Sequence, residues 1–149
     1  MDRKTWMGLM ARAEPPQLAA RLADLGAEPA HEMLRAPEVG SVMVQGRMGG
    51  TGAPFNLGEI TVTRCVLRLT GAAAPGADAV GHAHVQGRDR AHARRAALVD
   101  ALMQTPQAGA VRAAVLTPLA EAEAARRTSR AAKAAATKVE FFTMVRGED

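Results

Sequence analysis

The stretch Gly46–Arg64, GRMGGTGAPFNLGEITVTR, joins a cluster of glycines to a run of β-branched and apolar residues. Glycine-rich loops bind phosphate when they precede a helix, because converging backbone N–H groups and the positive end of the helix dipole then face the anion. Neither the Walker A spacing nor the GxGxxG spacing is satisfied, since Thr51 and Phe55 stand where those motifs require glycine. The run that follows, Glu59–Thr70, is rich in Ile, Val, Thr and Leu, which is typical of a strand. The loop is therefore predicted to join strand to strand rather than to hold a nucleotide.

Segments with the alternating pattern of strands lie on both sides of this loop. Before it, Val42 and Val44 face one way and their neighbours the other, which predicts a first strand. After it, apolar residues occupy even positions at Ile60 and Val62 but an odd position at Cys65. This change of parity indicates a bulge or a strand covered on both faces. A turn-rich segment at 71–78 leads to a third strand at 79–87, AVGHAHVQG. Three strands in succession predict an antiparallel meander.

Helices are predicted before the strands. Asp2 is expected to cap a first helix, because its side chain can accept a hydrogen bond from an unpaired backbone N–H group. The pair Pro15–Pro16 suits the first turn of a second helix, and Gly26 is placed to end it. A short helical turn is expected at 31–37, HEMLRAP, where the final proline stops it.

Two more helices are predicted after the strands. Asp89 is expected to cap the first, and Thr117–Pro118 to open a long alanine-rich one. The segment 139–147, VEFFTMVRG, is β-branched and aromatic, which favours a closing strand. The predicted fold is α+β, one domain over residues 1–149, with helices packed on an antiparallel sheet of about four strands.

The composition limits the possible functions. The chain has 149 residues, of which 48% are hydrophobic but only 3% aromatic, so much of the apolar content is alanine, which buries little area per side chain. The net charge of +4 favours anionic partners. The single cysteine, Cys65, excludes an internal disulfide framework and a multi-cysteine zinc site. No apolar run approaches the roughly 20 residues that span a bilayer, so we expect a cytoplasmic protein with no membrane contact.

One candidate anion site follows the third strand. Arg88, Arg90 and His92 gather at the start of a helix, and Arg64 lies on a neighbouring strand. Arginine forks match phosphate or phosphonate oxygens, and the helix dipole adds attraction. Asp89 competes for the same helix terminus as its cap. The alternative interpretation is a solvated or salt-bridged charged face.

Two further patterns leave alternatives open. His82 and His84 project from the same face of a strand, a geometry that can ligate a metal. The local sequence supplies no third ligand, and a polar strand face explains the two histidines equally.

Arg126, Arg130 and Lys133 form a basic helical stripe without interleaved aromatic residues. Nucleic-acid binding is therefore not expected, and the stripe is interpreted as a solvated or partner-facing helix. No residue is assigned as catalytic.

Three blocks of the sequence resemble the PhnG family, whose members are subunits of the bacterial carbon-phosphorus lyase machinery. The blocks are LRAPEVGSVMVQGRMGGTGAPFNLGEITVTRCVLRL at 34–69, GHAHVQGRDRAHARRAALVDAL at 81–102 and KAAATKVEFFTMVRGED at 133–149. The resemblance implies an accessory role in phosphonate breakdown. With PhnH, PhnI and PhnL, such a subunit supports the displacement of adenine from MgATP by an alkylphosphonate, which gives alpha-D-ribose 1-alkylphosphonate 5-triphosphate.

The same resemblance implies that PhnI, PhnH, PhnJ and ATP-binding subunits of the PhnL or PhnK type are partners. MgATP is then a substrate of the complex, and this chain binds no cofactor of its own. The alternatives are a stand-alone anion- or nucleic-acid-binding module and a histidine-based metal enzyme.

The glycine loop has its own predicted role in such a complex. We expect residues 46–58 to form an extended connection that inserts into a neighbouring subunit, with glycines that permit close backbone approach. The residues predicted to form this partner interface are Gly49, Gly50, Gly52, Pro54, Phe55 and Asn56.

Overall fold

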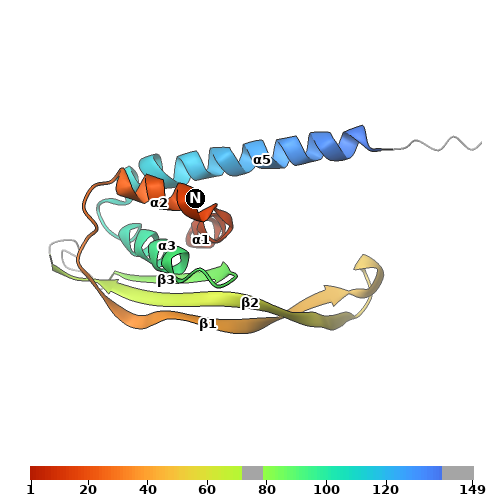
Figure 1. The fold of residues 1–149 in the computed structure, drawn as a ribbon, viewed down its shortest axis with the longest axis horizontal. Helices are drawn as coiled ribbons and strands as arrows, with labels where there is room; N and C mark the ends of the chain where they lie inside the picture. Colours follow the sequence, from red (N-terminus) through yellow and green to blue (C-terminus); the bar gives the residue numbers. More distant parts are fainter. Residues whose placement is uncertain (72–78, 139–149) are drawn as a thin grey trace, which may run out of the picture.

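A computed structural model describes residues 1–71 and 79–138. It consists of a three-stranded antiparallel sheet with helices packed on one face (Figure 1). The strands are β1 (His31–Arg47), β2 (Pro54–Leu69) and β3 (Val80–Gln86), in the spatial order β1-β2-β3. The predicted α+β class and the meander are therefore confirmed.

The central strand β2 supplies one side of the core. Near its C-terminal end, alternate side chains are buried beneath the helices, among them Thr63, Cys65, Leu67 and Leu69. The change of parity seen in the sequence lies at the edge of this buried region, where Val62 and Thr63 are both buried. Cys65 is fully buried, and its burial raises the pKa of its thiol, so it is a core residue rather than a nucleophile.

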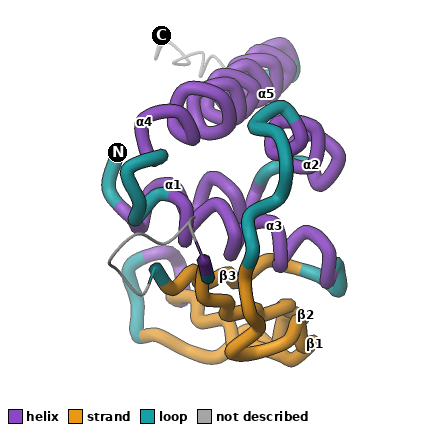
Figure 2. The backbone as a smooth tube through the Cα atoms, turned by 90° about the vertical axis from the view of Figure 1, so that its left-hand side faces the viewer, coloured by secondary structure: helices purple, strands orange, loops and turns teal. Residues whose placement is uncertain are grey.

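Two helices pack on this face of the sheet, α1 (Arg3–Arg12) and α3 (Arg90–Leu102), and α2 (Pro15–Ala23) packs on α3 from the other side. The predicted caps are confirmed, since Asp2 accepts a hydrogen bond from the Thr5 backbone N–H and Asp89 accepts one from the His92 backbone N–H, both at 2.8 Å. The helix α3 lies directly on β2 and β3 (Figure 2). Alanines on its inner face permit this close approach.

The remaining helical segments are continuous. They are α4 (Ala108–Val111), the π-helical turn η3 (Arg112–Leu116) and α5 (Thr117–Ala136). The helix α5 begins at Thr117, as predicted, but Thr117 is not its cap, because the chain is already helical through η3 and no side chain caps α5. The chain ahead of Pro118 is helical, so Pro118, which has no N–H group and a fixed φ, is accommodated inside a longer helix.

Two other predictions differ from the structure. Residues 31–37 form the start of β1 rather than a helical turn, because they pair with the C-terminal end of β2, as His31 does with Leu69. The predicted connection 46–58 is also too long, since β1 continues to Arg47 and β2 begins at Pro54. Only the short turn η1 (Met48–Gly50) and three more residues join them. The structure has three strands in its described part, and the predicted closing strand 139–147 lies outside it.

Candidate functional site

The β1–β2 hairpin extends beyond the helices as a hairpin arm, residues 42–60 (Figure 1). The strand β3 pairs with β2 only from Val62 to Arg68, so the arm is a two-stranded ribbon. Every residue from Pro54 to Ile60 is exposed. A ribbon that packs on nothing is marginally stable in water, so this geometry is typical of a segment that a partner covers.

The hairpin arm exposes large apolar side chains. The exposed fraction is 70% for Met48, 62% for Leu57 and 44% for Phe55. Val42, Met43 and Ile60 of the same arm are exposed as well. Because exposed apolar side chains that gather on one segment mark interaction sites, the arm is the strongest candidate for a protein interface.

Glycines shape the tip of the arm. Gly49 and Gly50 adopt φ values of 58° and 81°, a region that side chains rarely occupy. A Cβ atom on Gly52 would lie 2.7 Å from the Met48 carbonyl oxygen, and the Gly52 backbone N–H donates to that same oxygen at 2.8 Å. The tip is therefore a tight, internally bonded turn. The residues predicted to form the interface lie in this turn or just after it: Gly49, Gly50, Gly52, Pro54, Phe55 and Asn56.

The sheet face opposite the helices carries ionic pairs. Glu38 accepts hydrogen bonds from Arg64 at 2.8 Å and from Arg35 at 2.9 Å. His84 lies opposite Arg64 in the strand register, and partial desolvation of its exposed ring together with the nearby Arg64 charge lowers its pKa. His82 and His84 share this face, but the described part of the chain holds no group of three His, Cys, Asp or Glu residues that could bind a metal ion.

The structure does not gather the four residues of the predicted anion site. Arg64 lies on the sheet face opposite α3 and pairs with Glu38 there. His92 is only 3% exposed, and its Nε2 lies 2.9 Å from the carbonyl oxygen of Met10, so its ring belongs to the core. Arg88 and Arg90 are exposed beside the helix terminus that Asp89 caps.

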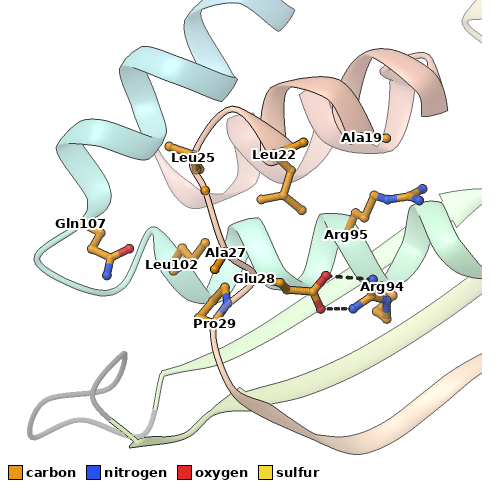
Figure 3. A pocket seen from close by; sticks show the side chains of 12 residues that line it. Ala19, Leu22, Leu25, Ala27, Glu28, Pro29, Arg94, Arg95, Leu102 and Gln107 are labelled. Carbon is orange, nitrogen blue, oxygen red and sulfur yellow. Dashed lines mark hydrogen bonds and ion pairs between the residues drawn. The ribbon is translucent and has the colours of Figure 1, made fainter.

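A cavity of about 500 Å³ lies between α2 and α3 (Figure 3). Its apolar wall includes Leu22, Leu25 and Leu102. Arg94 donates to both carboxylate oxygens of Glu28 at one side, and this ion pair lowers the pKa of Glu28. The cavity therefore combines an apolar wall with an ionic rim, but its arginine fork is already occupied by a carboxylate of the same chain.

Sequence reasoning missed one buried polar centre. Asp100 on α3 is fully buried and accepts four hydrogen bonds. Its donors are Arg3 Nη2 at 2.6 Å and Nε at 3.1 Å, Trp6 Nε1 at 2.8 Å, and the His82 backbone N–H at 2.9 Å. It thus joins α1 to β3 and α3. The available signal was an aspartate among the apolar residues of α3, where a buried carboxylate needs donors.

The sequence profile described as "Phosphonate metabolism protein PhnG" matches residues 1–147, which include the sheet, the hairpin arm and every described helix. The chain belongs to the PhnG family. The PhnG resemblance predicted from the three sequence blocks is therefore confirmed.

A curated PhnG protein of Rhizobium meliloti (strain 1021) is 43% identical to this chain over 152 residues. The alignment covers 99% of this chain and 91% of that relative. The relative is named "Alpha-D-ribose 1-methylphosphonate 5-triphosphate synthase subunit PhnG". Within the described residues, none of the helices has the length and apolar character that crossing a membrane requires.

Proposed function

We propose that this chain is an accessory subunit of an alpha-D-ribose 1-methylphosphonate 5-triphosphate synthase in phosphonate catabolism. In this role it supports the displacement of adenine from MgATP by an alkylphosphonate and binds no cofactor of its own. The observation that carries the proposal is the identity of 43% over 99% of the chain to a subunit of that synthase.

The site geometry supports an accessory role rather than catalysis by this chain. His92 is buried in the core, Cys65 is buried beneath the helices, and Asp100 is saturated by donors of the same chain. Within the described residues, the hairpin arm is the segment with the most exposed apolar side chains, and it has the character of an interface. We infer that the arm inserts into a neighbouring subunit.

The proposed partners are the other synthase subunits, PhnI and PhnH, together with PhnJ and an ATP-binding subunit of the PhnL or PhnK type. MgATP is then a substrate of the assembled complex. The proposed location is the cytoplasm, where MgATP is available.

The function is tested by measuring adenine release from MgATP and methylphosphonate. The assay compares PhnI, PhnH and PhnL with and without this chain, and also measures this chain alone. Release that requires the chain, with none from the chain alone, is the expected result. Equal release without the chain would contradict the proposal.

The role of the hairpin arm is tested with the double variant Phe55→Ser/Leu57→Ser. Both side chains are exposed, so the fold should be retained while the chain is lost from the co-expressed complex. Leu34→Ser is the matched control, since Leu34 is 49% exposed but lies outside the arm. Full assembly of the double variant would contradict insertion of the arm.

A further inference from the structure

Among the residues that the structure describes, the helix α5 contacts the rest of the molecule only through its first half. Leu119 is buried, Arg12 Nε donates to Glu123 at 2.8 Å, and Arg126 donates to Gln17 at 3.4 Å. Beyond these contacts every residue from Arg127 to Thr137 is exposed. About 15 Å of helix therefore extends past the body of the molecule, at 1.5 Å per residue.

This free half of α5, residues 127–136, carries three basic residues and no acidic residue. Arg127, Arg130 and Lys133 lie on it, and the sequence contains no Asp or Glu between Glu123 and Glu140. Arg130 and Lys133 form no hydrogen bond or ion pair with any residue that the structure describes. A charged helix face of this kind attracts an acidic surface.

The side of the free half away from Arg130 and Lys133 is built of small side chains. At 100° per residue, Arg130 and Lys133 fall on one side of the free half, whereas Ala131, Ala132 and Ala135 fall on another. Small side chains cost little entropy on burial and let another backbone approach closely. A surface packed against this helix can therefore lie close to its axis while its acidic groups reach the basic side.

The free half of α5 and the hairpin arm leave the body in the same direction. In Figure 1 both extend to the right of α1, α2 and α3, with α5 along the top and the hairpin along the bottom. In the perpendicular view of Figure 2 both run away from the viewer on opposite sides of the body. One partner placed beyond α1 can therefore contact both arms.

We propose that the free half of α5 is a second docking arm, which binds an acidic surface on the same partner subunit that receives the hairpin arm. This inference rests on the proposed function, because it takes the partner from the synthase complex. The hairpin arm buries its apolar side chains against the partner, and the positive charge of α5 attracts the partner's acidic surface and orients it. A protein partner is favoured over nucleic acid because the free half carries no aromatic residue for base stacking.

The test is charge reversal in the double variant Arg130→Glu/Lys133→Glu of the full chain, co-expressed with the other synthase subunits. The matched control is Lys4→Glu/Arg112→Glu, which changes the net charge equally at two exposed residues outside both arms. We expect the variant's apparent Kd for the rest of the complex to rise about tenfold over the control, because like charges then face each other. Helical content by circular dichroism should match the wild type in both variants.

Cross-linking tests whether one subunit contacts both arms. A photoreactive side chain is placed at Ala131 in one sample and at Leu57 in another, and the subunit in each adduct is identified by mass spectrometry. Adducts with the same subunit support the proposal, and adducts with two different subunits would overturn it.

The outcomes separate this inference from the function on which it rests. If the charge-reversed variant assembles as well as its control, the inference is overturned while the proposed function stands. Loss of nucleic-acid binding by that variant, with assembly unchanged, would likewise overturn it in favour of a nucleic-acid surface. If the wild-type chain does not assemble with the synthase subunits, the proposed function fails as well.

Discussion

At the scale of single residues, Asp100 is the point at which α1, α3 and β3 meet. Its carboxylate is fully buried and is satisfied by Arg3, Trp6 and the His82 backbone N–H. Removing this carboxylate leaves the N–H groups of Trp6 and His82 without an acceptor, which costs about 1–3 kcal/mol, whereas the Arg3 side chain is 45% exposed and can be solvated. We therefore expect Asp100→Ala to lower the free energy of unfolding by about that amount in urea denaturation.

The matched control for this prediction is Asp24→Ala. Asp24 forms only a 3.8 Å pair with Arg21 on the surface, and such pairs contribute about 0–1 kcal/mol. Similar losses in the two variants would show that the Asp100 network is not a centre of stability.

His92 makes stability depend on pH. Its Nε2 must donate to the Met10 carbonyl oxygen at 2.9 Å, and its buried Nδ1 has no hydrogen-bond partner. Burial, the largest cause, lowers the pKa of His92, so the unfolded chain binds a proton at a higher pH than the folded chain does. The stabilisation is therefore complete above the unfolded pKa of about 6.5 and is lost as pH falls below it.

The substitution His92→Gln tests this linkage. Glutamine offers an amide donor to Met10 but does not titrate, so its urea midpoint should change less than the wild-type midpoint between about pH 7.5 and 5.5. His84→Gln is the comparison, because the pKa of His84 is also lowered but its side chain is exposed. If the urea midpoint of His92→Gln depended on pH as strongly as that of the wild type, His92 would not be the source of the pH dependence.

At the scale of elements, the contact between β3 and α3 depends on one glycine. A Cβ atom on Gly81 would lie 1.9 Å from the Ala97 carbonyl oxygen and 2.8 Å from the Ala101 backbone nitrogen. Both are backbone atoms of α3, so the helix itself would have to move. Overpacking of this kind costs about 1–3 kcal/mol, and we expect Gly81→Ala to lower the free energy of unfolding accordingly.

Gly109 provides the control for this prediction. It lies in α4, and a Cβ atom there would meet nothing within 4 Å. Because alanine is favoured over glycine in a helix by about 0.8–1.0 kcal/mol, Gly109→Ala should stabilise the chain. Equal effects of the two substitutions would show that the close approach at Gly81 is not tight.

Whether an element could be predicted from the sequence depended on whether local features or distant contacts determine it. Local features decide helix starts, so the capping hydrogen bonds of Asp2 and Asp89 and the fixed φ of the Pro15–Pro16 pair were sufficient. Residues 31–37 were not predictable locally, because bulges after Met33 interrupt the alternation and the strand is held by its pairing with β2. The alternation of 42–44, and that of 60–69 on each side of its change of parity, was enough to predict the strands but not to show how far they extend.

The candidate site shows the same limit. The glycine and apolar residues of the arm tip could be grouped from the sequence because they are neighbours in the chain. The separation of Arg64 from α3, and the gathering of Arg3, Trp6 and His82 around Asp100, depend on packing between distant segments. No local periodicity encodes such placements, so they required the fold.

At the scale of the whole molecule, the fold divides into a packed body and two arms. None of the described segments covers the hairpin arm, whereas the part of β2 beyond Val62 lies between two strands and beneath α3. Amide hydrogens in the isolated chain should therefore exchange rapidly in residues 42–60 and slowly in 63–69. In the assembled complex we expect strong protection of the arm and of α5 residues 127–136, with little change in the body. Hydrogen exchange followed by mass spectrometry measures all of these segments in one experiment. Protection of the body alone would contradict partner binding through the arms, because a partner on the packed core would leave both arms in solvent.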